Sequence, residues 1–359
     1  MNKFINEFKK AKLNKLFLRK VSNRLLYTGS RLVGSLIDMD KLLENMALKP
    51  FALNIASTNI CNARCIFCGY KHLKAKQGVM DMRIFKKAVD DFTNIGGGNV
   101  GLTPPVGEVL MDPYILERVE YCRRSPLIAN IAFYTNGILL SKIDLRKLLT
   151  CGINTIIISI GGFNREDYSK IFGVDCFETL KDGIIELCEQ KRILKSPTRI
   201  GLVLRTHKSI DLCIKEPAYK ELTAIIDSIE YQYNYDSWNG RIKKSDLIGE
   251  MELRPNKPKN KPCSMFYADG PTILWNGDEL SECRELNGDS ELMLGNIMDS
   301  SLLSLFNSDK IRQMREGFAN GNLPDLCVNC THYNSVDTLR TIRLWRKSLT
   351  NKKRFYGKS

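Results

Sequence analysis

The sequence predicts an α/β protein with a parallel sheet, and two observations support this prediction. Six short apolar, β-prone runs recur between residues 51 and 233, and segments with helical periodicity lie between them. Strands that alternate with helices pair in parallel through right-handed crossovers. Six such units form either an open sheet or an incomplete barrel, and both architectures bind ligands at the carboxyl ends of their strands.

The predicted elements follow one another in a regular order. The strands are FALNIAST (51–58), GNVGLTP (98–104), IANIAFYTN (128–136), NTIIISI (154–160), TRIGLVLRT (198–206) and DSIEYQY (227–233). Helical segments lie near 81–95, 112–124, 141–151, 176–191 and 215–226. The first helix begins at Asp81, a capping residue, and ends before Gly96. After Gly240 a proline- and lysine-rich linker (252–263) precedes a cysteine-containing stretch with one further helix near 301–318.

Composition and charge exclude several classes of protein. The chain has 359 residues, 43% of them apolar, and no apolar run long enough to cross a bilayer. Its N-terminus lacks the apolar block of a secretory signal, so we expect a cytoplasmic protein. The net charge of +14 resides in residues 1–50 and 336–359, which leaves 35 charges of each sign between them. A neutral body with basic ends argues against an extended nucleic-acid groove.

Three cysteines lie close together directly after the first predicted strand. Cys61, Cys65 and Cys68 have the spacing C-x3-C-x2-C. Thiolates favour zinc and iron–sulfur clusters, and a structural zinc ion normally has four ligands. Three thiolates on one loop therefore favour a cubane cluster with one open iron, and the alternative is a zinc site completed by His72.

This motif resembles the signature of the radical S-adenosylmethionine (radical SAM) superfamily, including the aromatic Phe67 before Cys68. The resemblance implies that the three thiolates hold a 4Fe-4S cluster whose open iron binds S-adenosylmethionine. It also implies reductive cleavage of that cofactor to a 5′-deoxyadenosyl radical, which abstracts hydrogen from a substrate. The cofactor carries the chemistry, and the protein orients it and excludes water.

Further positions extend the resemblance around the cofactor. Gly107 and Glu108 resemble the Gly-Gly-Glu-Pro turn that contacts the methionine amino group, although Val106 and Val109 replace the flanking Gly and Pro. Asn136, in YTNG (134–137), ends the third strand as in many relatives. With Phe67, these residues are assigned to the cofactor site.

Two later strand ends and one loop complete the predicted site. Ser159, in SIGG (159–162), is a candidate for the cofactor carboxylate or ribose, although Gly161 replaces the Asp of the family. Arg205 ends the fifth strand, where relatives place an arginine near the cofactor or substrate, and the alternative is a structural ion pair. Asp236, in YDSWNGRI (235–242), is a catalytic candidate with Arg205, and the alternative for Asp236 is a capping role.

A second cysteine set follows the linker. It comprises Cys263, Cys283, Cys327 and Cys330. Four thiolates form a closed site, either zinc or a fully ligated cluster. The stretch resembles the SPASM/Twitch extension of radical SAM enzymes, and its four cysteines imply one auxiliary 4Fe-4S cluster. The remaining cysteines are expected to be small core residues.

Together these features predict the domains and the fold. The expected fold is a partial (β/α)6 TIM-like barrel with a small C-terminal cysteine-rich auxiliary-cluster domain. Residues 1–50 form a basic, partly amphipathic extension, 51–250 the radical SAM core, 251–335 the auxiliary domain and 336–359 a basic tail. The basic ends dock on the barrel or make weak contact with a membrane surface or partner.

The resemblance implies an oxidoreductase that dehydrogenates an alcohol of a sugar or cyclitol, with the auxiliary cluster accepting an electron. The alternative is a maturase that modifies a peptide or protein side chain. A third hypothesis, from the charge alone, is a zinc-bearing nucleic-acid-binding protein, which the neutral body disfavours. An external electron donor such as flavodoxin or ferredoxin is expected as a partner, and nucleic acid is not.

Overall fold

The structure, a computed structural model, describes residues 43, 47–267, 269–281 and 292–336. Nearly all of the predicted N-terminal extension (1–50) and C-terminal tail (336–359) lie outside the described residues, as does Cys283.

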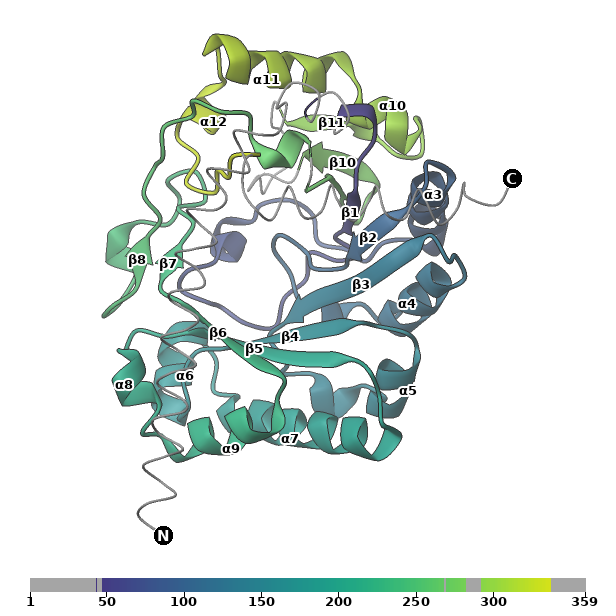
Figure 1. Cartoon of the computed structure of the whole chain (residues 1–359). Helices are drawn as coiled ribbons and strands as arrows, with labels where there is room; N and C mark the ends of the chain where they lie inside the picture. The colour runs from purple at the N-terminus through teal and green to yellow at the C-terminus, as the bar shows by residue number, and fades with distance from the viewer. Residues whose placement is uncertain (1–42, 44–46, 268, 282–291, 337–359) are drawn as a thin grey trace, which may run out of the picture.

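A nine-stranded sheet dominates the described part, and its strands run in the order β11-β10-β9-β1-β2-β3-β4-β5-β6 (Figure 1). The six predicted strands are confirmed and pair in parallel. They are β1 (Ala52–Ile55), β2 (Gly98–Gly101), β3 (Ile128–Thr135), β4 (Thr155–Ile160), β5 (Arg199–Arg205) and β6 (Ser228–Gln232). No pairing among the described strands joins β6 back to the other edge, so the barrel is open, as the predicted partial barrel requires.

The helices between the strands cover one face of this sheet. They are α3 (Met82–Asn94), α4 (Ile115–Arg123), α5 (Leu145–Thr150), α6 (Arg165–Phe172), α7 (Phe177–Leu194), α8 (Ile210–Cys213) and α9 (Pro217–Ile225). Side chains at alternate strand positions, such as Val100, Phe133 and Ile158, are buried in the main core on this face. The predicted cap is confirmed, since the Asp81 carboxylate accepts the Arg83 amide at 2.7 Å.

The opposite face of β1–β6 has a different composition. The strand register places on it mainly polar or small side chains: Asn54, Asn99, Gly101, Asn130, Ala132, Thr155, Ser159, Gly201 and Ser228. Most of these side chains retain solvent-accessible surface. The interior of a closed (β/α)8 barrel is usually packed with bulky branched residues. The inner face here is therefore a polar surface and not part of the apolar core.

The C-terminal region extends the same sheet. β9 (Pro271–Ile273) pairs in parallel with β1, and β10 (Asp278–Ser281) and β11 (Met293–Asn296) continue in antiparallel fashion. A separate pair joins β7 (Asn234–Tyr235) to β8 (Glu252–Leu253), so the predicted linker begins with a strand. The sequence analysis did not predict these five strands, which have two to four residues each.

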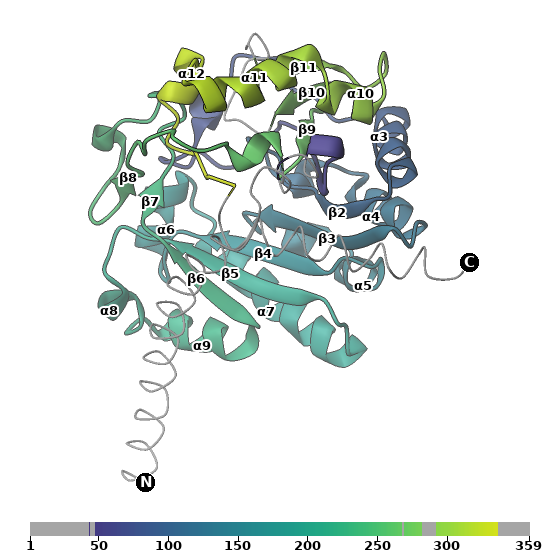
Figure 2. The same ribbon diagram turned by 45° about the horizontal axis from the view of Figure 1, so that its top comes forward.

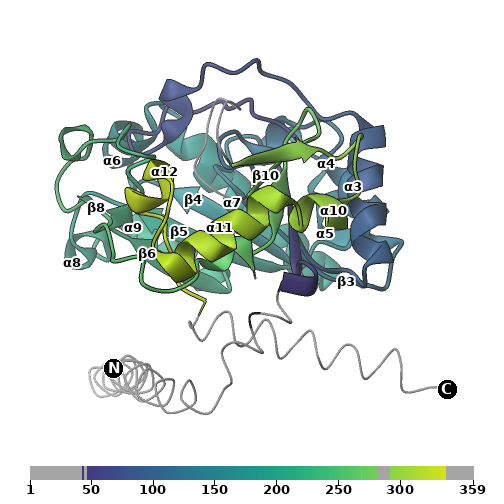
Figure 3. The ribbon, with the colours of Figure 1, turned by 90° about the horizontal axis from the view of Figure 1, so that it is seen from above.

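Three helices complete the C-terminal region, and α11 lies on the side of the sheet opposite α7 and α9 (Figures 2 and 3). They are α10 (Leu302–Phe306), α11 (Asp309–Asn320) and α12 (Asp325–Val328). The single helix expected at 301–318 is therefore two helices. The chain breaks at Asn307 and Ser308, and Ser308 has the extended backbone of a new N-cap.

One buried acid lies where this region meets the core. Glu279 in β10 is fully buried, and within the described part of the chain neither carboxylate oxygen has a hydrogen-bond partner. The charged group facing it is Asp91 of α3, whose carboxylate is bonded to Lys87 and to the Leu302 amide. Burial, and to a lesser extent the Asp91 charge, raise the pKa of Glu279 well above its usual value. The folded protein therefore holds a proton there that the unfolded chain releases above about pH 4.3.

We expect Glu279→Gln to remove a pH dependence of stability. Between the unfolded and the folded pKa of Glu279, the wild type loses about 1.4 kcal/mol of unfolding free energy per pH unit as the pH rises. The glutamine amide does not titrate, so the variant has no such loss. Its unfolding free energy, measured with urea, should therefore rise relative to that of the wild type from pH 5 to pH 8. Glu189→Gln, at an exposed position of α7, is the matched control. Parallel pH profiles for wild type and Glu279→Gln would contradict the prediction.

Candidate active site

The first cysteine trio lies on the loop that leaves β1. The Cys68 amide donates to the Cys65 carbonyl at 3.1 Å, and the Cys68 sulfur accepts the Tyr70 amide at 3.4 Å. The Tyr70 hydroxyl accepts the Cys61 amide at 3.1 Å. The loop is also fixed to the end of α6, because the Arg64 and Ile66 amides donate to carbonyls of that helix at 2.9 and 3.0 Å. These contacts hold the trio at the carboxyl edge of the sheet.

The three thiols affect one another electrostatically. Burial raises the pKa of Cys61 to about 12, and the charges of Glu108 and Cys68 add to the rise. Burial also raises the pKa of Cys65, with further contributions from Cys68 and Cys61, whereas Arg205 lowers it. Without a metal, Cys61 and Cys65 are therefore protonated at neutral pH. Metal ligation requires thiolates, so it releases these protons.

The donor set fits a cluster with one open iron. The loop brings together three thiols, and no three His, Cys, Asp or Glu side chains in the described part of the chain are grouped as ligands of a single metal ion. Soft thiolate ligands suit an iron–sulfur cluster.

Arg205 lies beside the trio at the end of β5. Its guanidinium carbon is 4.9 Å from the centre of the Phe67 ring, and Nη1 donates to the Gln232 side chain at 2.8 Å. Nε is 3.5 Å from the Ser159 hydroxyl of β4. No carboxylate pairs with this guanidinium in the described residues, so the structural ion pair considered for Arg205 is not formed. The structure therefore brings Phe67, Ser159 and Arg205 together.

Glu108 and Asn136 meet at the ends of β2 and β3. One oxygen of the buried Glu108 carboxylate accepts the Leu110 amide and the Thr135 hydroxyl, and the other accepts the Asn136 amide at 2.7 Å. The Asn136 side chain donates to Asn62 on the cysteine loop at 2.7 Å. These bonds tie the strand ends to the loop. The role of Glu108 and Asn136 in cofactor binding stays a prediction.

Two glycines relate to the family pattern, which Gly107 keeps and from which Gly161 departs. Gly107 has φ +126°, and a Cβ there would lie 2.9 Å from the Thr58 carbonyl oxygen, so only glycine allows this close approach to the loop. A Cβ at Gly161 would lie 2.8 Å from the Phe172 ring. The aspartate expected at position 161 is therefore excluded by the packing of α6.

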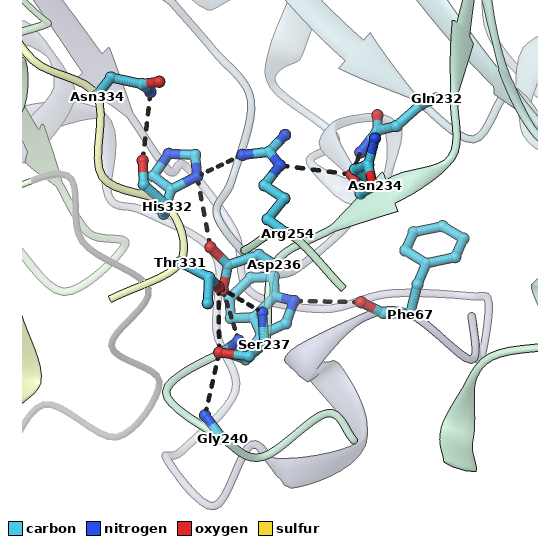
Figure 4. Close-up of polar contacts among 11 residues, drawn as sticks. Phe67, Gln232, Asn234, Asp236, Ser237, Gly240, Arg254, Thr331, His332 and Asn334 are labelled. Carbon is cyan, nitrogen blue, oxygen red and sulfur yellow. Dashed lines mark hydrogen bonds and ion pairs between the residues drawn. The ribbon is translucent and has the colours of Figure 1, made fainter. Parts of the chain in front are cut away.

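A polar network joins the segment after β7 to the C-terminal cysteine motif (Figure 4). The Ser237 amide donates to the Thr331 hydroxyl at 2.8 Å, and the Asp236 carboxylate lies 3.5 Å from Nδ1 of His332. The same His332 nitrogen is 3.1 Å from the Arg254 guanidinium. Asp236 also accepts the Trp238 amide, which is the capping role considered for it.

The same segment reaches the first cysteine trio. The Trp238 indole donates to the Phe67 carbonyl at 3.2 Å, next to Cys68. Tyr235 stacks on the Phe67 ring with a centroid distance of 5.0 Å. Residues 235–238 thus touch both cysteine regions. Tyr235, Thr331 and His332 were not predicted as site residues, and the only sequence signal was their position beside motifs already identified.

The second cysteine set converges where the structure describes it. Cys263 and Cys327 are buried and Cys330 is half-buried. Burial raises the pKa of Cys263 to about 12, and the charges of Cys330 and Cys327 contribute to the rise. The amide of Ser264, which follows Cys263, donates to the Asn334 carbonyl at 2.8 Å, and this brings the two segments together. Three thiols, two of them buried, fit an auxiliary cluster. Its fourth predicted ligand, Cys283, lies outside the described residues.

An open parallel barrel with clustered thiols at the carboxyl ends of its strands is an arrangement that suits an iron–sulfur protein. The family model of the radical SAM superfamily matches residues 55–203, and that of an iron–sulfur cluster-binding domain, SPASM, matches residues 263–331. The chain thus carries a radical SAM domain followed by a SPASM-type iron–sulfur domain. These two domains imply binding of 4Fe-4S clusters and S-adenosylmethionine.

The similar proteins are distant. GTP 3′,8-cyclase of Pasteurella multocida is 29% identical over 148 residues, which are 40% of this chain and 43% of that protein. The chain thus spans less than half the length of the curated relatives it matches first. Streptococcus suis SuiB bound to its precursor peptide SuiA has a TM-score of 0.57 at 15% identity, over 80% of this chain and 72% of that one. BtrN with AdoMet and 2-DOIA has a TM-score of 0.52 at 16% identity, over 79% and 93%. These structures show a shared fold.

We expect Cys65→Ala to abolish formation of 5′-deoxyadenosine. Loss of one of three thiolates leaves the cluster with too few ligands, so cleavage should fall by at least a hundredfold in an anaerobic assay with dithionite. Cys122→Ala, a core cysteine of α4, is the control and should retain cleavage. Reconstituted wild type should hold about eight irons. Cleavage by Cys65→Ala at the wild-type rate would refute the ligand assignment.

Proposed function

We propose that this protein is a radical SAM dehydrogenase that oxidises an alcohol of a sugar or cyclitol to a ketone. The observation that carries the proposal is the link between its two thiol sites, because residues 235–238 contact both Phe67 and the segment after Cys330. Such a link suits an oxidation in which one site starts the reaction and the other receives an electron.

The inner face of the sheet supports a hydroxylated substrate. Its side chains offer amide and hydroxyl groups. These extend from the half-exposed Asn99, Asn130, Thr155 and Ser228, in the amino-terminal halves of their strands, to Ser159 near the carboxyl edge. Groups of this kind can donate hydrogen bonds to several substrate hydroxyls and accept them as well. A wholly apolar substrate would leave them unpaired when it displaced water, at a cost in binding free energy.

The oxidation also needs a group that removes a proton from the alcohol. Oxidation of an alcohol to a ketone removes two electrons and two protons. When bound, the two clusters and S-adenosylmethionine supply the removal of one hydrogen atom and of one further electron. The remaining proton needs a base, and we assign this role to Asp236. Among the described residues its Oδ2 accepts no hydrogen bond, and this oxygen lies 3.5 Å from His332, which can take part in passing the proton on.

Around the cofactor, Arg205 and Ser159 are proposed to hold the carboxylate or ribose, with Phe67 packed beside them. Gly107, Glu108 and Asn136 are proposed to form the turn at the methionine amino group. An external donor such as flavodoxin or ferredoxin supplies the first electron. No described helix is long and apolar enough to span a membrane. A cytoplasmic location remains part of the proposal.

A second candidate is the modification of a peptide or protein side chain. The edge of β6 favours it, since β6 pairs only with β5 among the described strands. An unpaired strand edge can bind an extended peptide through main-chain hydrogen bonds. The two candidates differ in the substrate and share the thiol sites.

Deuterium transfer tests the proposed function. The holoenzyme is incubated with S-adenosylmethionine, dithionite and cyclitols or sugars deuterated at their carbinol carbons. We expect deuterium in 5′-deoxyadenosine and one equivalent of ketone from at least one substrate, by mass spectrometry. Deuterium transfer only from peptides would favour the second candidate and reject the first.

We expect Cys327→Ala to separate cofactor cleavage from oxidation. Its thiol belongs to the second site, so 5′-deoxyadenosine should still form while ketone yield falls by at least tenfold. Cys188→Ala, in the core of α7, provides the control. Unchanged ketone yield from a Cys327→Ala protein that has lost four irons would reject the electron-acceptor role.

A further inference from the structure

Lys259 lies in the segment that leads to Cys263, and its ammonium group is fixed by several contacts. Nζ donates to the Asn256 side chain and, at 2.6 Å, to the Lys257 carbonyl. It also lies 5.0 Å from the centre of the Tyr333 ring. The residue is half-buried, whereas Lys257 and Lys261 on the same segment are exposed. This lysine is therefore held in place, unlike a freely solvated surface charge.

These contacts place the ammonium at the second thiol site. Asn256, which accepts from Lys259, donates its own amide to the Val328 carbonyl at 3.1 Å, between Cys327 and Cys330. Tyr333 follows Cys330 by three residues, and its hydroxyl donates to the Lys261 carbonyl at 2.9 Å. The lysine segment and the Cys-Val-Asn-Cys motif are thus bonded to each other around the ammonium group.

The electrostatics agree with this placement. Burial lowers the pKa of Lys259, and the charges of Cys330, Cys263 and Cys327 raise it. All three described thiols of the second site therefore act on one cation. Two further charges act here. The Lys257 ammonium contributes to the lowered pKa of Lys259, and the Asp236 carboxylate, which faces His332 and Arg254, contributes to the raised pKa of Cys330.

We infer that Lys259 is a positioning residue that makes the second thiol site a better electron acceptor, an inference that rests on the proposed function. In the oxidation, the alcohol loses one hydrogen atom to the adenosyl group and one proton to the base, and the remaining electron passes to the second site. That electron adds one negative charge there. A fixed cation stabilises the reduced form more than the oxidised form and so raises the reduction potential.

A redox titration tests the inference on the full-length chain. Cys61, Cys65 and Cys68 are replaced by alanine, so that only the second cluster contributes to the electron paramagnetic resonance signal. Lys259→Met is compared with Lys259→Arg, which keeps the charge, and with Lys257→Met, which removes an exposed charge from the same segment. Iron content is measured for each protein, and Lys259→Gln replaces Lys259→Met if the latter loses iron.

We expect Lys259→Met to lower the midpoint potential by about 59 mV, a tenfold change in the one-electron equilibrium. Lys259→Arg and Lys257→Met should stay close to the parent protein. An equal shift in Lys259→Met and Lys257→Met, or no shift in either, would overturn the inference. A shift in Lys259→Met, combined with unchanged ketone yield in Cys327→Ala, would reject the proposed electron-acceptor role and leave the influence of Lys259 intact.

Discussion

The alternation of side chains along β1–β6 is the constraint on which the site depends. Every second residue, such as Phe133 or Ile158, is committed to the apolar core beneath the helices. The residues between them must face the other way, and parallel pairing brings all the carboxyl ends to one edge. The cysteine loop, Glu108 and Arg205 come from different strands, and they meet there because the apolar face fixes the register of each strand.

The site also depends on the segment after β7, which neither family model covers. Trp238 donates to the Phe67 carbonyl, and Ser237 accepts and donates hydrogen bonds at Thr331, beyond Cys330. Because these bonds involve buried or half-buried groups, breaking one leaves a desolvated partner unpaired. β9 also pairs directly with β1. The two thiol sites are therefore parts of one continuous structure, although the motifs that mark them lie far apart in the sequence.

The sequence was sufficient for what depends on local patterns. The six strands follow from apolar runs, the α3 cap follows from Asp81, and the trio follows from its spacing. Contacts between distant segments left no local signal. The pairing of β9 with β1 joins residues more than 200 positions apart, and the bond from Asn256 to Val328 spans 72 residues. The break between α10 and α11 was missed, although Ser308 is a typical N-cap residue. Gly161 departs from the family pattern, and only the packing of α6 explains why.

At both thiol sites a nearby cation offsets the negative charge of the clustered thiolates. Clustered thiolates repel one another, and burial increases the cost of their charge. The structure places a desolvated cation beside each set. Arg205 interacts with Cys65 and Cys68, and Lys259 interacts with the second set. Each cation is half-buried and loses part of its hydration there, and the anions it faces offset that cost. The two cations differ in kind. The planar Arg205 guanidinium can also bind a carboxylate in two places, as an open site requires, whereas the Lys259 ammonium acts as a point charge and suits a closed one.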